Sequence, residues 1–346
     1  MGDIHMNIIA APNRKRTEGT DMKKMVLAAW LLVFALALSG CTKATPASNV
    51  TSNRKQIVVG FSQVGSESNW RKANTVSMTQ SLSEDRGYRL FFSDAQQSQS
   101  NQITAIRNFI KQKVDYIVVA PVTEQGWNEI LIEARDAGIP VIIVDRMVDV
   151  QDESLFTCWV GTNPAKEGAL AVQWMGAQFG DSPLRIAHLQ GTLDSTAQRG
   201  RTTGLDEGLS EHPSWTLAFR DTGNFTQAQG RALVEKLLKD GVEFDLIYAE
   251  NDDMAYGAVE ALEAAGRIPG EDVTIISFDA NLHALELAME GKINYVIECN
   301  PLHGPRVEAV IQQLEAGETP QKYTYVDGTT FDRASITQEL LDSREY

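Results

Sequence analysis

Residues 116–146 read YIVVAPVTEQGWNEILIEARDAGIPVIIVDR, and this stretch decides the fold class. It holds a short apolar run (116–120), a helical stretch (127–137) stopped by Gly138, and a second apolar run (139–144). Strands that alternate with helices in this way are typical of parallel sheets. Because both runs are apolar nearly throughout, we expect strands that are covered on both faces.

The same rhythm continues outward along the chain. Short runs rich in β-branched residues predict strands, and apolar residues at helical spacing predict helices. We expect further strands at 57–61, 88–93, 185–189, 216–220, 246–249, 273–277 and 295–298. We expect further helices at 70–86, 101–113, 166–179, 199–210, 226–238, 255–265, 283–290 and 305–316. The rhythm restarts near Phe156, so the sequence predicts an α/β fold with two units of similar plan.

The N-terminal region has the pattern of an export signal. Lys23 and Lys24 precede an apolar run (25–38), which ends in Ser39-Gly40-Cys41. A cysteine at this place is similar to the lipidation site of bacterial lipoproteins. We therefore expect a signal peptide at 22–40, and a lipid on Cys41 that attaches an exported chain to a membrane. The alternative is a transmembrane anchor, but the run is short for a span of about 20 residues.

Two polar segments flank this signal. Residues 1–21 have no apolar periodicity and are interpreted as a spurious extension, with Met22 as the true start. Residues 41–55 are poor in apolar side chains and are interpreted as a flexible tether.

Composition excludes several classes of function. Residues 1–40 carry five Lys/Arg and three Asp/Glu of a chain with net charge −15, so the 306 residues from Cys41 carry −17. Such an acidic chain is unsuited to nucleic acid, which is bound by clustered Lys/Arg. Its length suits two domains. Besides Cys41, the sequence has Cys158 and Cys299, but no CxxC pair and no Cys/His cluster at metal spacing. We expect no metal and no cofactor.

Polar residues follow the predicted strands, where open parallel sheets bind their ligands. Asp145 and Arg146 follow one strand directly, and Asn251 and Asp279 lie at the ends of two others. Arg201 lies early in a predicted helix. Carboxylates accept hydrogen bonds from hydroxyl groups and arginines donate in a fixed fork. The alternatives are a local ion pair for Asp145–Arg146, a surface arginine, a helix cap for Asn251 and a turn for Asp279.

Two aromatic residues suit a carbohydrate ligand. Trp70 and Phe225 lie at predicted cleft edges, where a sugar ring can stack on an aromatic face, and burial in the core is the alternative for both. For Cys158 and Cys299, two buried free thiols are favoured over a disulfide.

Catalytic motifs are missing from the sequence. It has no GxSxG, no HExxH and no P-loop. Asp252 and Asp253 are paired carboxylates, but adjacent residues seldom face one bond from opposite sides as hydrolysis requires. We expect a binding protein and not an enzyme.

Six segments in order resemble the periplasmic sugar-binding proteins of ABC transporters, of the ribose/galactose-binding type. They are VVGFSQVGSESNWR (58–71), IVVAPV (117–122), IPVIIVDR (139–146), LQGTLDSTAQRGRTTG (189–204), AENDDMAYGAVEALEAAG (249–266) and ISFDA (276–280). The resemblance spans about 56–326, and the FSQVGSESNWR segment is most similar to the galactofuranose-binding subgroup.

This resemblance implies two Rossmann-like domains, each a parallel sheet flanked by helices, joined by three crossover strands. The first would comprise 56–158 and 301–327, and the second 159–300 and 328–346. It further implies a monomer that captures a monosaccharide by hinge closure and delivers it to the permease subunits of an ABC importer. We expect a furanose such as galactofuranose. The alternatives are a sugar receptor that signals to a membrane protein and an exported glycoside-acting enzyme.

The resemblance also assigns roles to individual residues. Trp70 and Phe225 match the stacking aromatics, and Arg71 follows Trp70 as in the furanose-binding subgroup. The residues that bind sugar hydroxyls are matched by Asp145, Arg146, Arg201, Asn251 and Asp279. Glu67, in the first segment, is also expected to bind the ligand. Glu298 matches the polar residue at the third crossover, with Cys299 or Asn300 as alternatives. Ala120 departs from the ribose-binding pattern, which has Asn there, and this counts against ribose.

Related transcription repressors share the fold. They carry an N-terminal DNA-binding segment, where this chain has the pattern of an export signal and a tether. Together with the acidic charge, this difference excludes a repressor.

Overall fold

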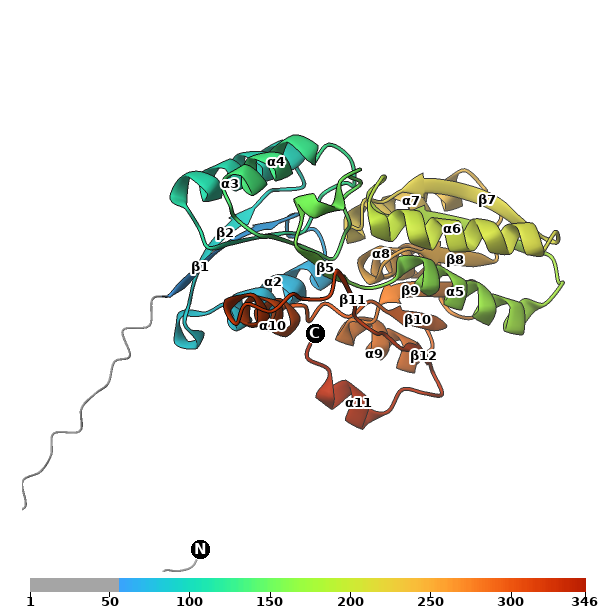
Figure 1. Ribbon diagram of the computed structural model, residues 1–346. Coiled ribbons are helices and arrows are strands. Elements are labelled where there is room, and N and C mark those ends of the chain that lie inside the picture. The colour runs from blue at the N-terminus through green and yellow to red at the C-terminus, as the bar shows by residue number, and fades with distance from the viewer. Residues whose placement is uncertain (1–55) are drawn as a thin grey trace, which may run out of the picture. The chain divides into compact units, whose positions relative to one another are not determined.

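The computed structural model describes residues 56–346, which form two six-stranded sheets flanked by helices (Figure 1). The predicted signal peptide, Cys41 and the tether lie outside the described residues. Within 56–346, none of the helices has the length and apolar character that a membrane crossing needs. We call each sheet with its helices a lobe.

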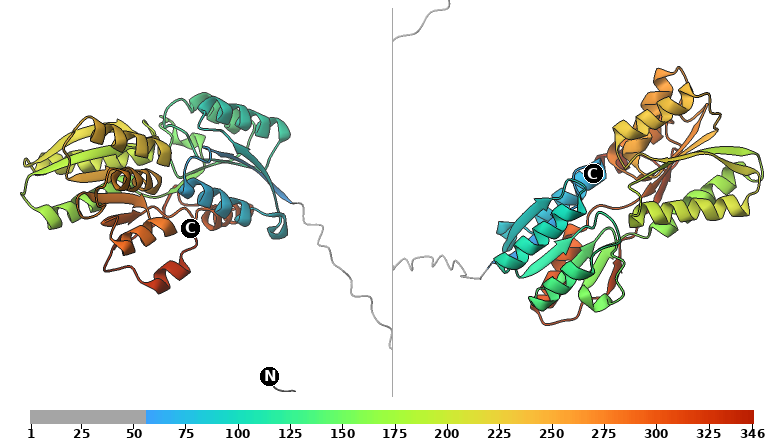
Figure 2. Two further views of the ribbon diagram at one scale, coloured as in Figure 1. Left: turned by 180° about the vertical axis from the view of Figure 1, so that it is seen from behind. Right: turned by 90° about the horizontal axis from the view of Figure 1, so that it is seen from above.

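The first lobe is built on a sheet in the order β11-β5-β4-β3-β1-β2, in which every pairing is parallel. Its strands are β1 (Ile57–Gln63), β2 (Tyr88–Asp94), β3 (Tyr116–Val119), β4 (Val141–Val144), β5 (Cys158–Gly161) and β11 (Tyr323–Tyr325). Helices α3 (Gln99–Gln112) and α4 (Asn128–Asp136) cover one face, and α2 (Asn69–Ser81) and α10 (Gly304–Glu315) cover the other (Figure 2). The short 3-10 helices η1 (Glu84–Arg86) and η2 (Glu153–Leu155) lie in the connections.

The second lobe repeats this plan with the sheet order β12-β10-β9-β8-β6-β7. Its strands are β6 (Leu184–Gln190), β7 (Trp215–Thr222), β8 (Leu246–Ala249), β9 (Thr274–Asp279), β10 (Tyr295–Glu298) and β12 (Thr330–Asp332). Only β12, in this described sheet, runs antiparallel to its neighbour. The helices are α5 (Pro164–Phe179), α6 (Thr196–Glu211), α7 (Gln227–Lys239), α8 (Asp252–Ala264), α9 (Leu282–Glu290) and α11 (Gln338–Ser343).

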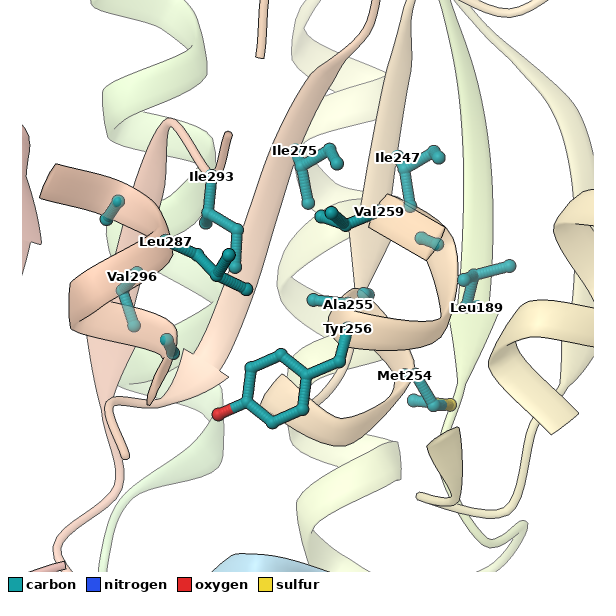
Figure 3. Close-up of a cluster of buried hydrophobic side chains, with 14 of the residues drawn as sticks. Leu189, Ile247, Met254, Ala255, Tyr256, Val259, Ile275, Leu287, Ile293 and Val296 are labelled. Carbon is teal, nitrogen blue, oxygen red and sulfur yellow. The ribbon is translucent and has the colours of Figure 1, made fainter. Parts of the chain in front are cut away.

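The core of the second lobe shows why its strands are apolar throughout. Val259 of α8 packs beside Ile247 of β8 and Ile275 of β9, and Tyr256 of α8 belongs to the same buried cluster (Figure 3). A separate cluster on the opposite face joins the same sheet to α5 and α6. Burial on both faces stabilises the sheet by roughly 25 cal/mol per Å² of apolar surface removed from water.

The chain passes between the two sheets three times, after β5, after β10 and after β11. The predicted α/β fold with two sheets and three crossovers is therefore confirmed. All of β5 pairs within the first sheet, whereas the expected domain boundary falls after its first residue, Cys158. The exact division of the chain into domains stays a prediction.

Helix capping explains two differences from the predicted elements. The side chain of Ser195 accepts a hydrogen bond from Gln198 N, and that of Asn251 accepts one from Met254 N. Such caps satisfy free amides of the first turn. As a result, α6 begins at Thr196 and α8 at Asp252, each three residues before the predicted start.

The single helix predicted for 70–86 was wrong. Helix α2 ends at Ser81, because Leu82 leaves the helical conformation and is fully buried against the sheet. A short 3-10 turn then leads to Gly87, whose left-handed φ of 92° ends it. The strands β11 and β12 are only three residues long each, too short for a periodic signal.

Candidate functional site

A cavity between the lobes lies at the C-terminal ends of the strands. Nine of the ten predicted site residues line it: Glu67, Trp70, Arg71, Asp145, Arg146, Arg201, Phe225, Asn251 and Asp279. Ser68, Ala197 and Cys299 complete the lining. The space between these side chains, including its open side, is about 310 Å³. Residues from both lobes thus meet around one small chamber.

Arg71 and Asp145 form the centre of the first-lobe half. Arg71 donates from Nη2 to Asp145 Oδ2 (2.7 Å), from Nε to Glu67 Oε1 (3.0 Å) and from Nη1 to Gln63 Oε1 (3.2 Å). Burial acts to raise the pKa of Asp145, but attraction by Arg71 and Arg146 outweighs it and lowers that pKa. Each nitrogen of the Arg71 guanidinium thereby donates one hydrogen bond, and Arg71 holds an ionised Asp145 in one orientation.

Of the three arginines that line the cavity, Arg146 lies farthest from a carboxylate that could neutralise its charge. Its Nη1 donates to Val122 O (2.7 Å), but its nearest carboxylate oxygens are 3.7 Å away on Glu67 and 3.9 Å away on Asp145. Burial, together with repulsion from Arg71, lowers the pKa of Arg146 to about 10. The remaining guanidinium donors of Arg146 therefore suit acceptor atoms of a ligand.

In the second-lobe half of the cavity, Arg201 is the buried arginine that contacts several acidic residues. It donates from Nε to Glu167 Oε2 (2.8 Å) and from Nη1 to Glu250 O, and its Nη2 lies 3.5 Å from Asp279 Oδ1. The alternative of a solvated surface arginine is wrong, since only 2 % of its surface is exposed. Burial raises the pKa of Asp279 well above its usual range, which favours its neutral form at the cavity.

Asn251 is a helix cap, which was its alternative interpretation, and it also borders the cavity. It caps α8 through Oδ1, which accepts from Met254 N (3.0 Å). Its Nδ2 donates to Phe225 O (3.1 Å), so the same side chain fixes the backbone that carries the aromatic ring.

Trp70 and Phe225 are both buried and both line the cavity. Trp70 donates from Nε1 across the cleft to Cys299 O, and its ring meets His303 edge to face at 5.7 Å. Phe225 lies under the guanidinium of Arg146, with 5.6 Å between Cζ and the ring centroid. Each arrangement leaves an aromatic surface at a wall of the chamber.

Three of the lining residues have a left-handed backbone. The φ angles are 63° at Asp145, 61° at Phe225 and 112° at Asp279. Non-glycine residues adopt such angles at a cost of order 1–3 kcal/mol each, and they cluster at functional sites. The sequence pattern shows no sign of this, because none of the three positions is a glycine.

Glu298 lies outside the chamber. Its carboxylate accepts from Arg344 Nη1 (2.6 Å), Thr329 N (2.9 Å) and Tyr346 Oη, beside a separate cavity lined by all three crossovers. Successive side chains of a strand point to opposite sides, so the next residue, Cys299, lines the chamber instead. Of the three candidates at this crossover, the structure places Cys299 in the chamber.

The two described cysteines are free thiols, as favoured, and the alternative of a disulfide between them is wrong. Cys299 Sγ lies 3.4 Å from Thr162 Oγ1, and burial raises the pKa of the Cys158 thiol to about 11.

Sequence reasoning missed Ser68 and Ala197. Ser68 is the N-cap of α2, where it accepts from Arg71 N (3.1 Å), and Ala197 lies in the first turn of α6. A serine three residues before Arg71 is a capping signal that could have identified the first of them. Among the described residues, no group of three or more potential metal ligands comes together.

Comparison with known proteins identifies the family of the chain. Residues 59–303 match the family model described as a periplasmic binding protein domain. The chain belongs to this family. Periplasmic binding proteins capture substrates and are not enzymes, and family membership implies export.

Three relatives illustrate the likeness. The galactofuranose-binding protein YtfQ of Escherichia coli is 36% identical over 288 residues, 82% of this chain and 90% of YtfQ. A Mycobacterium smegmatis structure in complex with β-D-fucofuranose is 40% identical, with a TM-score of 0.78 over 80% of this chain and 92% of that one. The arabinose transporter component of Shewanella sp. ANA-3, bound to L-arabinofuranose, is 37% identical, with a TM-score of 0.79 over 83% and 95%.

Proposed function

We propose that this protein captures a monosaccharide in furanose form, such as galactofuranose, for an ABC importer. The observation that carries the proposal is the convergence of nine predicted site residues, from both lobes, on one chamber of hydrogen-bonding and aromatic side chains. The ligands of the related proteins, which are furanoses in two solved structures, support the ring form.

Charge balance at the chamber supports a neutral ligand. Arg71, Arg146 and Arg201 supply three positive charges. Glu67, Asp145 and Glu167 lie within 3.0 Å of Arg71 or Arg201 and supply three negative charges. Asp279 adds none in its neutral form, since burial raises its pKa. Among these groups the charges balance, which suits a neutral polyol better than an anionic or cationic substrate.

Hydroxyl recognition follows from the unequal pairing of these groups. Asp145 is held by Arg71 and accepts from sugar hydroxyls, whereas Arg146 has donors left for sugar oxygens. Charge-assisted hydrogen bonds of this kind are stronger than neutral ones. An analogue without one hydroxyl leaves a buried partner unpaired, which is costly and gives selectivity.

Closure of the lobes completes the site. Trp70 of the first lobe donates to Cys299 O beside the second lobe, and the amide of Asn69 donates to Asp253 Oδ2 (3.0 Å). These bonds require the two lobes to be together, so hinge closure on a sugar is the conformational step. A membrane permease then recognises the closed form, and ATP hydrolysis belongs to a separate subunit.

The N-terminal features belong to the same proposal. A signal peptide at 22–40, a lipid on Cys41 and a tether at 41–55 would hold a monomeric receptor at the membrane that contains its importer. The domains would divide at 158/159, 300/301 and 327/328. The sequence pattern is the support for each of these statements.

A thermal-shift assay on residues 42–346 tests the function. The panel holds galactose, arabinose, ribose, glucose and a galactofuranoside, with nucleosides as controls. A ligand at 100 times its Kd stabilises by about 2.7 kcal/mol, a shift that is readily visible. We expect a shift with galactose or arabinose that Arg146→Ala abolishes. If no sugar shifts the melting temperature, the proposal is wrong.

A further inference from the structure

Glu250 is a fully buried acid that follows β8 directly and does not line the chamber. Its carboxylate accepts hydrogen bonds from three groups in two segments of the second lobe, β6 with the residue after it and α6. Gly191 N meets Oε2 at 2.7 Å, and Thr202 Oγ1 and His188 Nε2 meet Oε1 at 2.7 and 2.8 Å. Its backbone carbonyl accepts from Arg201 Nη1. One side chain outside the site thus holds two segments that build it.

Gly191 connects Glu250 to the aromatic wall. A methyl group added at Gly191 would lie 1.9 Å from Cζ of Phe225, so the ring rests directly on this glycine. The amide of Gly191 donates to Glu250, so the carboxylate fixes the position of the backbone against which the Phe225 ring packs.

His188 donates one of the three hydrogen bonds to the carboxylate of Glu250. Arg220 Nε donates to His188 Nδ1 (2.9 Å), which leaves Nε2 as the protonated nitrogen that donates to Glu250. All three groups on the carboxylate are therefore donors, which suits an unprotonated Glu250. Arg220 in turn pairs with Asp206 on α6, so the network extends from the molecular surface to the floor of the site.

We propose that Glu250 is the positioning residue of the second-lobe half of the site, and that it sets sugar affinity through Phe225 and Arg201 without touching the sugar. This role rests on the proposed function. A buried polar network in which every acceptor is satisfied holds its members rigidly, and loss of one bond is felt by all of them.

The substitution Glu250→Gln separates this role from general stability. Its amide keeps oxygen toward the two donors, His188 and Thr202, and turns its NH₂ toward the N–H of Gly191. The bond to Gly191 is then lost, while the volume is unchanged. We expect the Kd for galactose or arabinose to rise about tenfold, in keeping with a lost hydrogen bond to a charged group. The Gly191 amide proton, shifted downfield by the carboxylate, should move upfield.

Asp245→Asn is the matched control. Asp245 precedes β8 as Glu250 follows it, and its carboxylate accepts from Arg185 N (2.9 Å) and Arg185 Nε (2.9 Å) away from the chamber. This change should lower the melting temperature but leave the Kd within about twofold and the Gly191 resonance in place. If Glu250→Gln does not fold, Thr202→Val removes one of the three bonds and should raise the Kd severalfold.

The outcomes distinguish the two proposals. A wild-type chain that binds neither galactose, arabinose nor the galactofuranoside overturns the proposed function and this role with it. A wild-type chain that binds one of them, while Glu250→Gln and Thr202→Val bind it equally well, overturns the positioning role alone. The same holds if Asp245→Asn weakens binding as much as Glu250→Gln does.

Discussion

The carboxylate of Asp253, in the first turn of α8, accepts a hydrogen bond of 3.0 Å from the amide of Asn69, the first residue of α2. Asp253 belongs to the second lobe and Asn69 to the first. An acid at a helix N-terminus satisfies a free amide and interacts favourably with the helix dipole. The N-terminus of α2 therefore receives part of its capping from the opposite lobe, and only when the lobes are together.

Asp253→Ala should weaken sugar binding by about tenfold or more, because a hydrogen bond to a charged group contributes about 1.5–3 kcal/mol. Arg199→Ala is the comparison, since Arg199 pairs with Glu124 across the cleft at 2.8 Å but is half exposed. Exposed pairs contribute about 0–1 kcal/mol, so its effect should stay within about twofold. Titration calorimetry measures both, and equal effects would count against a closing role for Asp253.

Arg146→Lys should weaken sugar binding by at least about tenfold, although the charge is kept. The fixed fork of arginine places one nitrogen on Val122 O and keeps others for the ligand, which a single ammonium group cannot do. Calorimetry against galactose and arabinose gives the affinity. The urea midpoint of the unliganded variant should change little, and a variant that binds as tightly as wild type would exclude Arg146 as a ligand-binding group.

Gly191→Ala should both weaken binding and destabilise the fold. The new methyl group would overlap the Phe225 ring, and overpacking of this kind costs about 1–3 kcal/mol. Gly176→Ala in α5 is the control, because its Cβ would meet nothing nearer than 3.7 Å. Alanine is favoured over glycine in a helix by roughly 0.5–1 kcal/mol, so this control should be neutral or stabilising. Urea denaturation with and without sugar measures both.

His303 should make the protein sensitive to mild acid. It is fully buried beside Trp70, and burial lowers the pKa of this imidazole to about 4. The unfolded chain then binds a proton between about pH 6.5 and 4 that the folded chain does not, so stability falls as pH falls through this window. The loss from this residue is about 3 kcal/mol at pH 4.

Urea denaturation between pH 7 and 4 checks this estimate. The unfolding free energy of His303→Gln should fall less steeply than that of wild type. Parallel curves for the two proteins would show that His303 does not titrate as its burial implies.

The thiols of residues 42–346 should resist reagents in the folded protein and react when it unfolds. Cys158 and Cys299 are free and buried, and burial raises the pKa of both, so little thiolate forms near neutral pH. Titration with a thiol reagent should give two reactive groups in denaturant. A mass two hydrogens lower, with no reactive thiol, would show a disulfide instead.

The sequence predicted most of the fold and of the site for a physical reason. Strands buried on both faces leave clear apolar runs, and polar residues at strand ends gather at the C-terminal edge of each sheet. Asp145 lies at this edge of the first sheet and Asp279 at that of the second. The misses are local. Neither the break of α2 at Leu82 nor the three-residue strands β11 and β12 leave a periodic signal.

The site also contains features that only three-dimensional packing creates. The placement of Cys299 in the chamber in place of Glu298 depends on the orientation of side chains at one strand end. The second-lobe network through Glu250 joins residues 188, 191, 202 and 250, which are 62 positions apart at the extremes, so no local pattern reveals it.

The two unreactive thiols have a practical consequence. In a chain that starts after Cys41, a single cysteine introduced at the cleft rim, for example at the exposed Arg199, would be the only site open to a maleimide dye. Its fluorescence would report the approach of the lobes directly. This receptor can therefore be turned into a reagentless optical sensor for its own ligand, without first removing a native cysteine.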